Sequence, residues 1–214
     1  MKLVLYHAPR ACSIVTLTSL WEAGADPEVR LVNTPKREQY GDAYMKLNPK
    51  SKVPCLLIDG EPLTENVALL SWVARTFPEK KLLPTDPKNA IRALSLMAWI
   101  ASGVHPMLPR LNAPARFTDM TEAHPSIKKT GATELAKAAK IADEMLAGRE
   151  WIFDQFSIVD TYLWWAFDRA KTYGLDASPY KNIAAHAARV EARPATKRAR
   201  DLAVELEAQL AKAA

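Results

Sequence analysis

The sequence predicts an α/β domain followed by an all-α domain. Its first 80 or so residues alternate short apolar runs typical of strands with helical runs, whereas the sequence after about residue 88 keeps helical periodicity. Between them, residues 78–87 are charged and bracketed by prolines, which is typical of a linker. We therefore expect an N-terminal domain at 1–79, a linker at 80–88 and an all-helical domain at 89–214.

The N-terminal domain begins with a strand, a helix and a second strand. Residues 3–6 are a short apolar run, residues 13–23 have helical spacing and end at Gly24, and residues 28–32 form the second strand pattern. A crossover of this kind is right-handed and joins parallel strands.

The remainder of that domain contributes two more strands and a helix. A polar segment at 34–46 precedes two strands that meet at Asp59-Gly60, a strong hairpin turn signal. A helix follows at about 67–77. The order βαβ and then ββα favours a small mixed sheet with helices on its faces, in a thioredoxin-like arrangement.

The C-terminal domain is predicted to be a helical bundle. Ser157 as N-cap and Asp160 three residues later form a capping box, and the apolar run behind them at 162–167 is a candidate core. The helical segments are 88–104, 121–147, 158–173, 180–192 and 195–211.

Composition excludes several classes of protein. The chain of 214 residues is 49% hydrophobic, and no window approaches 18 uncharged apolar residues. The apolar run at the N-terminus is too short and too often interrupted by polar residues for a signal peptide. We therefore expect a cytoplasmic protein with no membrane partner. Cys12 and Cys55 are then free thiols. The net charge of +5 includes a basic cluster at 189–200, which we interpret as a solvated helix face and not a nucleic-acid site. No metal-ligand spacing and no glycine-rich phosphate loop is present in the sequence, so neither a metal nor a nucleotide is expected.

The segment 48–66 has the properties of a peptide-binding edge. Pro54 fits the start of a strand because proline cannot donate to a ladder. If the Val53-Pro54 bond is cis, which the sequence leaves open, the backbone groups of Val53 face outward and can pair with an extended ligand. Glu65 and Asn66 stand directly before a helix, where a carboxylate and bare helix amides can hold the two ends of an amino-acid zwitterion.

Together these motifs resemble the cytosolic glutathione S-transferases, and most closely the bacterial beta class. The resemblance implies glutathione as co-substrate, a small hydrophobic electrophile as second substrate, a homodimer and a detoxifying role. It also implies that Val53 and Pro54 meet the cysteinyl unit of glutathione while Glu65 and Asn66 bind its γ-glutamyl end. The matching residues are Tyr6, Ala11-Cys12-Ser13, Asn48-Pro49-Lys50, Val53-Pro54, Leu63-Thr64-Glu65 and Ala101-Ser102-x-Val104-His105.

Three residues are candidates for activating the glutathione thiol. Cys12 and Ser13 fall where the first strand's loop meets the first helix, so helix amides and the helix dipole would stabilise negative charge there. The resemblance implies that Cys12 contacts the sulfur and can form a mixed disulfide with it. Ser13 could instead donate a hydrogen bond. Tyr6 matches the tyrosine-type classes, but in a beta-like context the resemblance implies that it is part of the wall of the site.

The helical domain supplies a further candidate. The resemblance implies that His105 lies over the sulfur, but the Asn and Lys that accompany it in the family are replaced by Ala98 and Pro106. For the glycyl carboxylate we expect Lys36, Arg37 or Lys52. The second substrate is expected to be bound between the domains, by Pro9, Arg10, Trp99, Met107, Arg110 and Phe117.

Three hypotheses about function follow. The first is transfer of the glutathione thiolate to an electrophilic carbon. The second is glutathione-dependent thiol–disulfide exchange through Cys12. The third is a glutathione-binding or ligand-carrying scaffold without turnover, which the intact Val53-Pro54, Glu65 and Asn66 disfavour.

Overall fold

The computed structural model describes residues 1–212 and divides the chain into two compact units. The first comprises Met1–Leu83 and the C-terminal stretch from Ala192, and the second comprises Pro84–Glu191. This division differs from the expected boundaries of 1–79, 80–88 and 89–214, because the last helix clusters with the N-terminal unit.

The first unit is built on a mixed sheet of four strands. The strands are β1 (Leu3–His7), β2 (Glu28–Leu31), β3 (Cys55–Ile58) and β4 (Glu61–Thr64), and they lie in the order β2-β1-β3-β4. β1 is parallel to β2, whereas β3 is antiparallel to both β1 and β4. The predicted thioredoxin-like sheet and its hairpin are confirmed.

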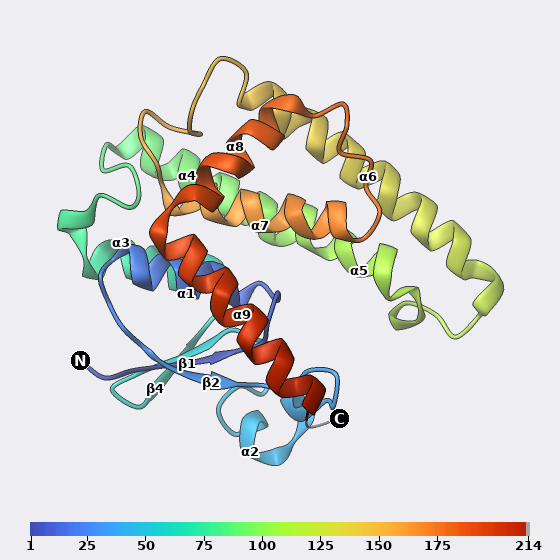
Figure 1. Cartoon of the computed structure of the whole chain (residues 1–214), viewed down its shortest axis with the longest axis horizontal. Coiled ribbons are helices and arrows are strands. Elements are labelled where there is room, and N and C mark those ends of the chain that lie inside the picture. Colours follow the sequence, from blue (N-terminus) through green and yellow to red (C-terminus); the bar gives the residue numbers. More distant parts are fainter. Residues whose placement is uncertain (213–214) are drawn as a thin grey trace. The chain divides into compact units, whose positions relative to one another are not determined.

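Helices cover both faces of this sheet. Figure 1 shows α1 (Ser13–Glu22) and α3 (Asn66–Thr76) over one face and the short α2 (Asp42–Met45) on the other. Two 3₁₀ turns, η1 (Glu38–Tyr40) and η2 (Pro78–Lys80), complete the unit's N-terminal part. On the α2 face, Val32, Tyr44 and Cys55 form a buried cluster against which Tyr6 packs.

The last helix, α9 (Pro194–Lys212), is held to the first unit by charge pairs. Arg193 binds both carboxylate oxygens of Glu22 at 2.7 Å, and Arg198 reaches Asp26 at 2.9 Å while lying 4.1 Å from the ring centre of Trp21. Two arginines of the basic cluster that we interpreted as a solvated face therefore make intramolecular contacts. A bidentate arginine–carboxylate pair fixes geometry as well as charge.

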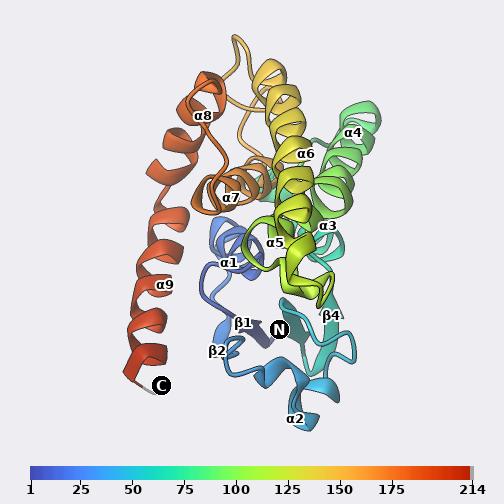
Figure 2. The same ribbon diagram turned by 90° about the vertical axis from the view of Figure 1, so that its right-hand side faces the viewer.

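The second unit is entirely helical. Its first helix, α4 (Pro87–Trp99), continues into a π-helical turn, η3 (Ile100–Val104), and a 3₁₀ turn, η4 (His105–Met107). The single helix predicted at 88–104 is thus interrupted, and α5 (Leu108–Asn112) was not predicted. Figure 2 shows α5 beside α6, with α7 and α8 in the same unit. The other elements are η5 (Pro114–Arg116), η6 (Thr121–Ala123), α6 (His124–Met145), α7 (Ile158–Thr172) and α8 (Lys181–Ala192).

The predicted capping box at the start of α7 is present. Asp160 is fully buried, and its carboxylate accepts hydrogen bonds from the backbone N–H and hydroxyl of Ser157, both at 2.8 Å. The same carboxylate also receives the N–H of Ile152 and Nε2 of His186, each at 2.9 Å. One side chain therefore joins the start of α7, the loop before it and α8.

Residues Pro87–Asn112 are long enough to span a membrane and contain an 18-residue window with a mean hydropathy of 1.2, and they are the one such stretch among residues 1–212. The stretch includes Lys88, Arg92 and Arg110, so it is not a run of uncharged apolar residues. Apolar helices of soluble proteins meet the same criteria, and in the structure this stretch is broken by η3 and η4. We therefore treat it as part of the helical unit.

Close packing of α5 on α6 depends on Gly131. A Cβ atom at this position would lie 2.7 Å from Cβ of Arg110 and 2.7 Å from Cδ1 of Leu111. Gly131→Ala is expected to destabilise the protein by about 1 kcal/mol or more, because the clash outweighs the helix propensity that alanine gains. Urea unfolding measures the change, with the exposed Thr133→Ala on the same helix as a control; a Gly131→Ala protein more stable than wild type would contradict this packing.

Candidate active site

Three segments of the first unit meet at Cys12. It is the N-cap residue of α1, and its Sγ–H donates to the carbonyl of Val53 at 3.4 Å. Its own carbonyl accepts a hydrogen bond from Nδ2 of Asn66 at 3.0 Å. The bond between Val53 and Pro54, which the sequence left open, is cis. The geometry thus brings together Cys12, Val53 and the start of α3, as the sequence predicts.

The Cys12 thiol is held in its protonated form. Burial is the largest cause that raises the pKa of this thiol, and the nearby Glu65 carboxylate acts in the same direction. Backbone and Asn66 hydrogen bonds and the Lys52 charge act in the opposite direction, and the resulting pKa is about 12. At neutral pH the side chain is consequently a hydrogen-bond donor and not a thiolate nucleophile.

The Ser13 hydroxyl already makes hydrogen bonds to nearby residues of the first unit. The side chain is fully buried, and its Oγ lies 2.8 Å from Nδ1 of His7. Oγ also accepts a hydrogen bond from the backbone N–H of Ala8 at 3.2 Å and donates one to the Ala8 carbonyl at 3.3 Å. These contacts fasten the end of β1 to the start of α1. They argue against Ser13 as the group that donates to a substrate sulfur.

Tyr6 lies on the α2 face of the sheet. Its hydroxyl accepts from Nη1 of Arg30 at 3.2 Å, and its ring meets Tyr44 edge to face with centroids 5.6 Å apart. This setting favours the interpretation of Tyr6 as part of the wall.

Glu65 is the N-cap residue of α3 and has an unusual backbone. Its φ of 73° lies in a region that non-glycine residues rarely adopt, and such conformations are concentrated at functional sites. Its carboxylate pairs with Nζ of Lys50 at 2.6 Å, and its side chain is 67% exposed. An exposed pair of this kind is worth only about 0–1 kcal/mol, so a ligand ammonium can replace Lys50 at low cost.

The side chain of Asn66 makes its hydrogen bonds within the first unit. Asn66 is 6% exposed. Its Oδ1 accepts a hydrogen bond from Oγ1 of Thr16 at 2.7 Å, and its Nδ2 donates one to the Cys12 carbonyl. The side chain therefore ties α3 to α1 and is not presented to a ligand. The first backbone amides of α3 remain the groups suited to a carboxylate.

The two lysines expected at the glycyl carboxylate are both exposed. The Lys52 carbonyl accepts from the Tyr44 hydroxyl and from Nδ2 of Asn48, each at 2.6 Å, which fixes the loop before Val53. Lys36 sits after a turn in which its N–H donates to Oδ1 of Asn33 at 3.0 Å. Of the two, Lys52 is on the better-anchored backbone.

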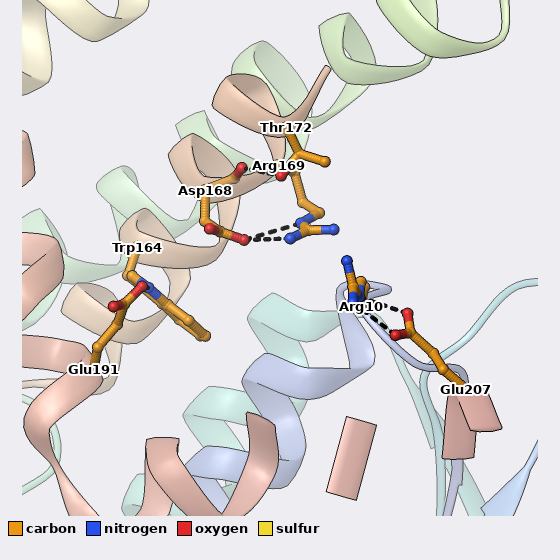
Figure 3. Close-up of polar contacts among 7 residues, drawn as sticks. All are labelled: Arg10, Trp164, Asp168, Arg169, Thr172, Glu191 and Glu207. Atoms are coloured by element: carbon orange, nitrogen blue, oxygen red, sulfur yellow. Dashed lines mark hydrogen bonds and ion pairs between the residues drawn. The ribbon is translucent and has the colours of Figure 1, made fainter. Parts of the chain in front are cut away.

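The remaining candidates are divided between the two units. In the first unit, Pro9 and Arg10 lie in the turn after β1, where Arg10 has a φ of 58°. The Arg10 guanidinium forms an ion pair with Glu207 of α9 at 2.5 Å, as Figure 3 shows. In the helical unit, Arg110 contacts the sulfur of Met107 and lies 5.4 Å from the ring centre of Phe117. His105 follows the π-helical turn that begins after Trp99, and its ring packs edge to face on Trp165 at 4.7 Å. Single π turns are frequent at functional sites.

Comparison with known proteins decides the family. Residues 1–75 match the family model "Glutathione S-transferase, N-terminal domain". Over 194 residues the chain is 33% identical to glutathione S-transferase GstA of Escherichia coli O157:H7, covering 89% of this chain and 93% of that protein.

The chain belongs to the glutathione S-transferase family.

This glutathione S-transferase is also similar to an isomerase and to solved bacterial structures. It is 30% identical over 187 residues to maleylacetoacetate isomerase of Rattus norvegicus, covering 85% of this chain and 84% of that one. Among solved structures, a sphingomonad glutathione S-transferase complexed with glutathione is 31% identical, with a TM-score of 0.83 and coverage of 94% and 98%. A bacterial beta class glutathione S-transferase of Sphingomonas chungbukensis is 29% identical, with a TM-score of 0.82 and the same coverage. The similarity to the beta class is confirmed.

Sequence reasoning missed four residues that shape this site. Lys50 was noticed only as part of a motif, although its spacing from Glu65 across a hairpin could have suggested the pair. Glu207, Thr16 and His7 gave no local signal. Their partners Arg10, Asn66 and Ser13 acquire them only through the fold.

His7 makes the stability of this transferase pH-dependent. It is fully buried at the end of β1, its Nε2 has no hydrogen-bond partner, and burial lowers its pKa from 6.5 to about 4. The unfolded chain therefore binds more protons between those values, so the free energy of unfolding should fall by about 3 kcal/mol as pH drops from 6.5 to 4 and stay level above 6.5.

Urea unfolding across pH 4–8 tests this dependence on His7. We expect His7→Asn to be less stable at neutral pH but to lose less stability on acidification than wild type does. Equal slopes for the two proteins between pH 4 and 6.5 would contradict the assignment to His7.

Proposed function

We propose that this protein binds glutathione in its first unit and transfers the glutathione thiolate to the electrophilic carbon of a small hydrophobic substrate. The observation that carries the proposal is the convergence of the protonated Cys12 thiol, the Val53 carbonyl and the Glu65 carboxylate at one corner. The relatives named as glutathione S-transferases support it.

Glutathione binding follows from the groups at this corner. The Glu65 carboxylate takes the γ-glutamyl ammonium in place of Lys50, and the first amides of α3 take the adjacent carboxylate. The backbone of Val53, which lies before β3 and outside its strand pairings, pairs with the extended cysteinyl unit. Lys52, with Lys36 as the alternative, meets the glycyl carboxylate.

The chemistry requires a stabilised thiolate. The Cys12 Sγ–H turns from the Val53 carbonyl to the substrate sulfur and donates a hydrogen bond, and the N-terminus of α1 adds favourable dipole potential. Both effects lower the pKa of the bound thiol. The thiolate then supplies the electron pair of the new C–S bond, and the leaving group departs with its own pair. His105 is proposed as a further residue with a role in the reaction, because it follows a π-helical turn.

Substitutions at Cys12 and Ser13 test this assignment. Cys12→Ala is expected to lower kcat/KM at pH 7 about tenfold and to raise by about one unit the apparent pKa of its pH profile, because a lost donor of 1.4 kcal/mol corresponds to one unit. Cys12→Ser keeps a donor and should stay near wild type. Ser13→Ala should reduce stability more than it changes the profile; if it alone shifted the profile, Ser13 would be the activating residue.

Two other activities are ranked below conjugation. Disulfide exchange through Cys12 is disfavoured by the raised pKa of its thiol, since the thiolate is the attacking form. Isomerisation is favoured by the similarity to maleylacetoacetate isomerase, and the half-exposed guanidinium of Arg10 suits an acidic substrate. An assay of maleylacetoacetate turnover with glutathione, in wild type and Arg10→Met, distinguishes this activity from conjugation.

We also propose that the protein is a homodimer acting in the cytoplasm. The helical unit exposes large apolar side chains on α4 and α6: Ile91 is 66% exposed, Leu94 43% and Ile141 54%. Such surface is typical of subunit contacts. Cys12 and Cys55 are both free thiols, which fits a reducing compartment. Sedimentation of the protein at micromolar concentration tests the dimer.

A further inference from the structure

The carbonyl oxygen of Lys52 accepts two hydrogen bonds from buried side chains. The Tyr44 hydroxyl and Nδ2 of Asn48 each donate to it at 2.6 Å. A carbonyl oxygen has two lone pairs, so these two donors use its full capacity. Neither donor has a part in the proposed transfer of the thiolate. The two hydrogen bonds nevertheless fall on the peptide group directly before Val53, which lies at the candidate active site.

Packing holds both donors in place. Tyr44 is 6% exposed and lies in the buried cluster on the α2 face, where its ring meets Tyr6 edge to face. Asn48 is 2% exposed, its Oδ1 accepts from the N–H of Lys50 at 3.2 Å, and its own N–H donates to the Tyr44 carbonyl at 2.9 Å. Burial raises the pKa of the Tyr44 hydroxyl above its ordinary value, so this group stays protonated and remains a donor at neutral pH.

The direction of the Lys52 carbonyl fixes the direction of the Val53 N–H. In a planar trans peptide group the C=O and the N–H point in opposite directions. Among residues 1–212 the one cis peptide bond is Val53-Pro54, so the bond between Lys52 and Val53 is trans. Its carbonyl faces the buried donors, and the N–H of Val53 therefore faces away from them. Turning this peptide over would leave two buried donors without an acceptor, which is costly.

The other backbone group of Val53 is held by a different residue. Its carbonyl accepts from Sγ of Cys12, and Val53 lies before β3, outside the strand pairings. The N–H of Val53 is thus oriented through Tyr44 and Asn48, and its carbonyl through Cys12. Loss of the Tyr44 hydroxyl should consequently change how glutathione is held without removing the donor to its sulfur.

We propose that Tyr44 is a positioning residue for glutathione, which, together with Asn48, aims the Val53 N–H at the carbonyl oxygen of the cysteinyl unit. This role rests on the proposed function, because it concerns the same glutathione site. Tyr44 acts through the Lys52–Val53 peptide and not by touching the reacting atoms. Its contribution is preorganisation, because a peptide that is already oriented loses less conformational freedom when glutathione binds.

Binding of glutathione to Tyr44→Phe, measured by titration calorimetry, tests this role. The substitution keeps the ring and removes one of the two donors, so we expect glutathione to bind about 3- to 10-fold more weakly. KM for glutathione should rise by a similar factor, with a smaller change in kcat, and the apparent pKa of the pH profile should stay at the wild-type value. Tyr40→Phe makes the same change at a tyrosine that is 51% exposed and should bind glutathione as wild type does.

A second ligand separates this role from a general loss of structure. γ-Glutamylcysteamine keeps the γ-glutamyl end, the amide N–H and the thiol of glutathione but lacks the cysteinyl carbonyl and the glycine. Its affinity for Tyr44→Phe should be within about twofold of its affinity for wild type, because it has no acceptor for the Val53 N–H. If Tyr44→Phe does not fold, Asn48→Ala removes the other donor and gives the same comparison.

Two results would overturn the positioning role and leave conjugation by the wild type intact. The first is equal weakening of both ligands by the substitution, and the second is undiminished glutathione binding by the variant. A wild type that does not bind glutathione would overturn the proposed function as well.

Discussion

Replacing Glu65 by Gln is expected to weaken glutathione binding about 10- to 100-fold. The carboxylate is the anionic group at the start of α3, and a hydrogen bond to a charged partner contributes about 1.5–3 kcal/mol. Glutamine keeps the size and one acceptor but removes the charge that the γ-glutamyl ammonium needs. Titration calorimetry with glutathione measures the loss directly.

Two control variants test whether the loss of glutathione binding comes from the negative charge at Glu65 itself. Glu61→Gln removes an exposed carboxylate from the neighbouring strand β4 and should bind glutathione as wild type does. Lys50→Met removes the ammonium that occupies Glu65 and should bind glutathione as tightly as wild type or slightly more tightly. Undiminished binding by Glu65→Gln would remove Glu65 from the site.

Asp160→Ala is expected to lower the free energy of unfolding by about 3–5 kcal/mol. The substitution deletes a buried carboxylate that accepts four hydrogen bonds, and it leaves donors of Ile152, Ser157 and His186 without partners inside the protein. It also removes the capping box of α7, the helix at the centre of the second unit's core. Urea unfolding at pH 7 measures the change.

Asp86→Ala is the matched control for Asp160→Ala. Asp86 caps α4 by accepting from the N–H of Asn89 at 2.9 Å, but it is exposed. Loss of an exposed cap typically costs about 1 kcal/mol. If both variants lost the same stability, the buried network around Asp160 would have no role beyond helix capping.

The parts of the fold that could be predicted depend on local chemistry. Asp59-Gly60 forms its hairpin because a tight turn needs residues that accept positive φ, and both have it. Ser157 and Asp160 cap α7 because their side chains reach only the adjacent backbone. The patterns at Val53-Pro54 and Glu65 are also local, because one precedes a strand and the other a helix. The strand after Pro54 was expected at an edge, but β3 is an interior strand that pairs with both β1 and β4.

The parts that could not be predicted depend on contacts distant in sequence. Arg193 meets Glu22 across 171 positions, and no local pattern distinguishes this arginine from a solvated one. Asn66 was expected to bind the γ-glutamyl end of glutathione together with Glu65, and no local pattern indicates that its side chain contacts Thr16 and Cys12. Ser13 was a candidate donor until the buried His7 was seen beside it. The π-helical turn at Ile100–Val104, which follows α4, is likewise not indicated by the helical periodicity of the sequence.

The central claim is that Cys12 stabilises the thiolate of bound glutathione by donating a hydrogen bond. The most direct measurement is a pH titration of thiolate ultraviolet absorbance for glutathione bound to wild type and to Cys12→Ala. In wild type the bound thiol should ionise at a lower pH than free glutathione, and in Cys12→Ala its pKa should return most of the way to the free value. A bound thiol that ionises as in solution, or equally in both proteins, would contradict the claim.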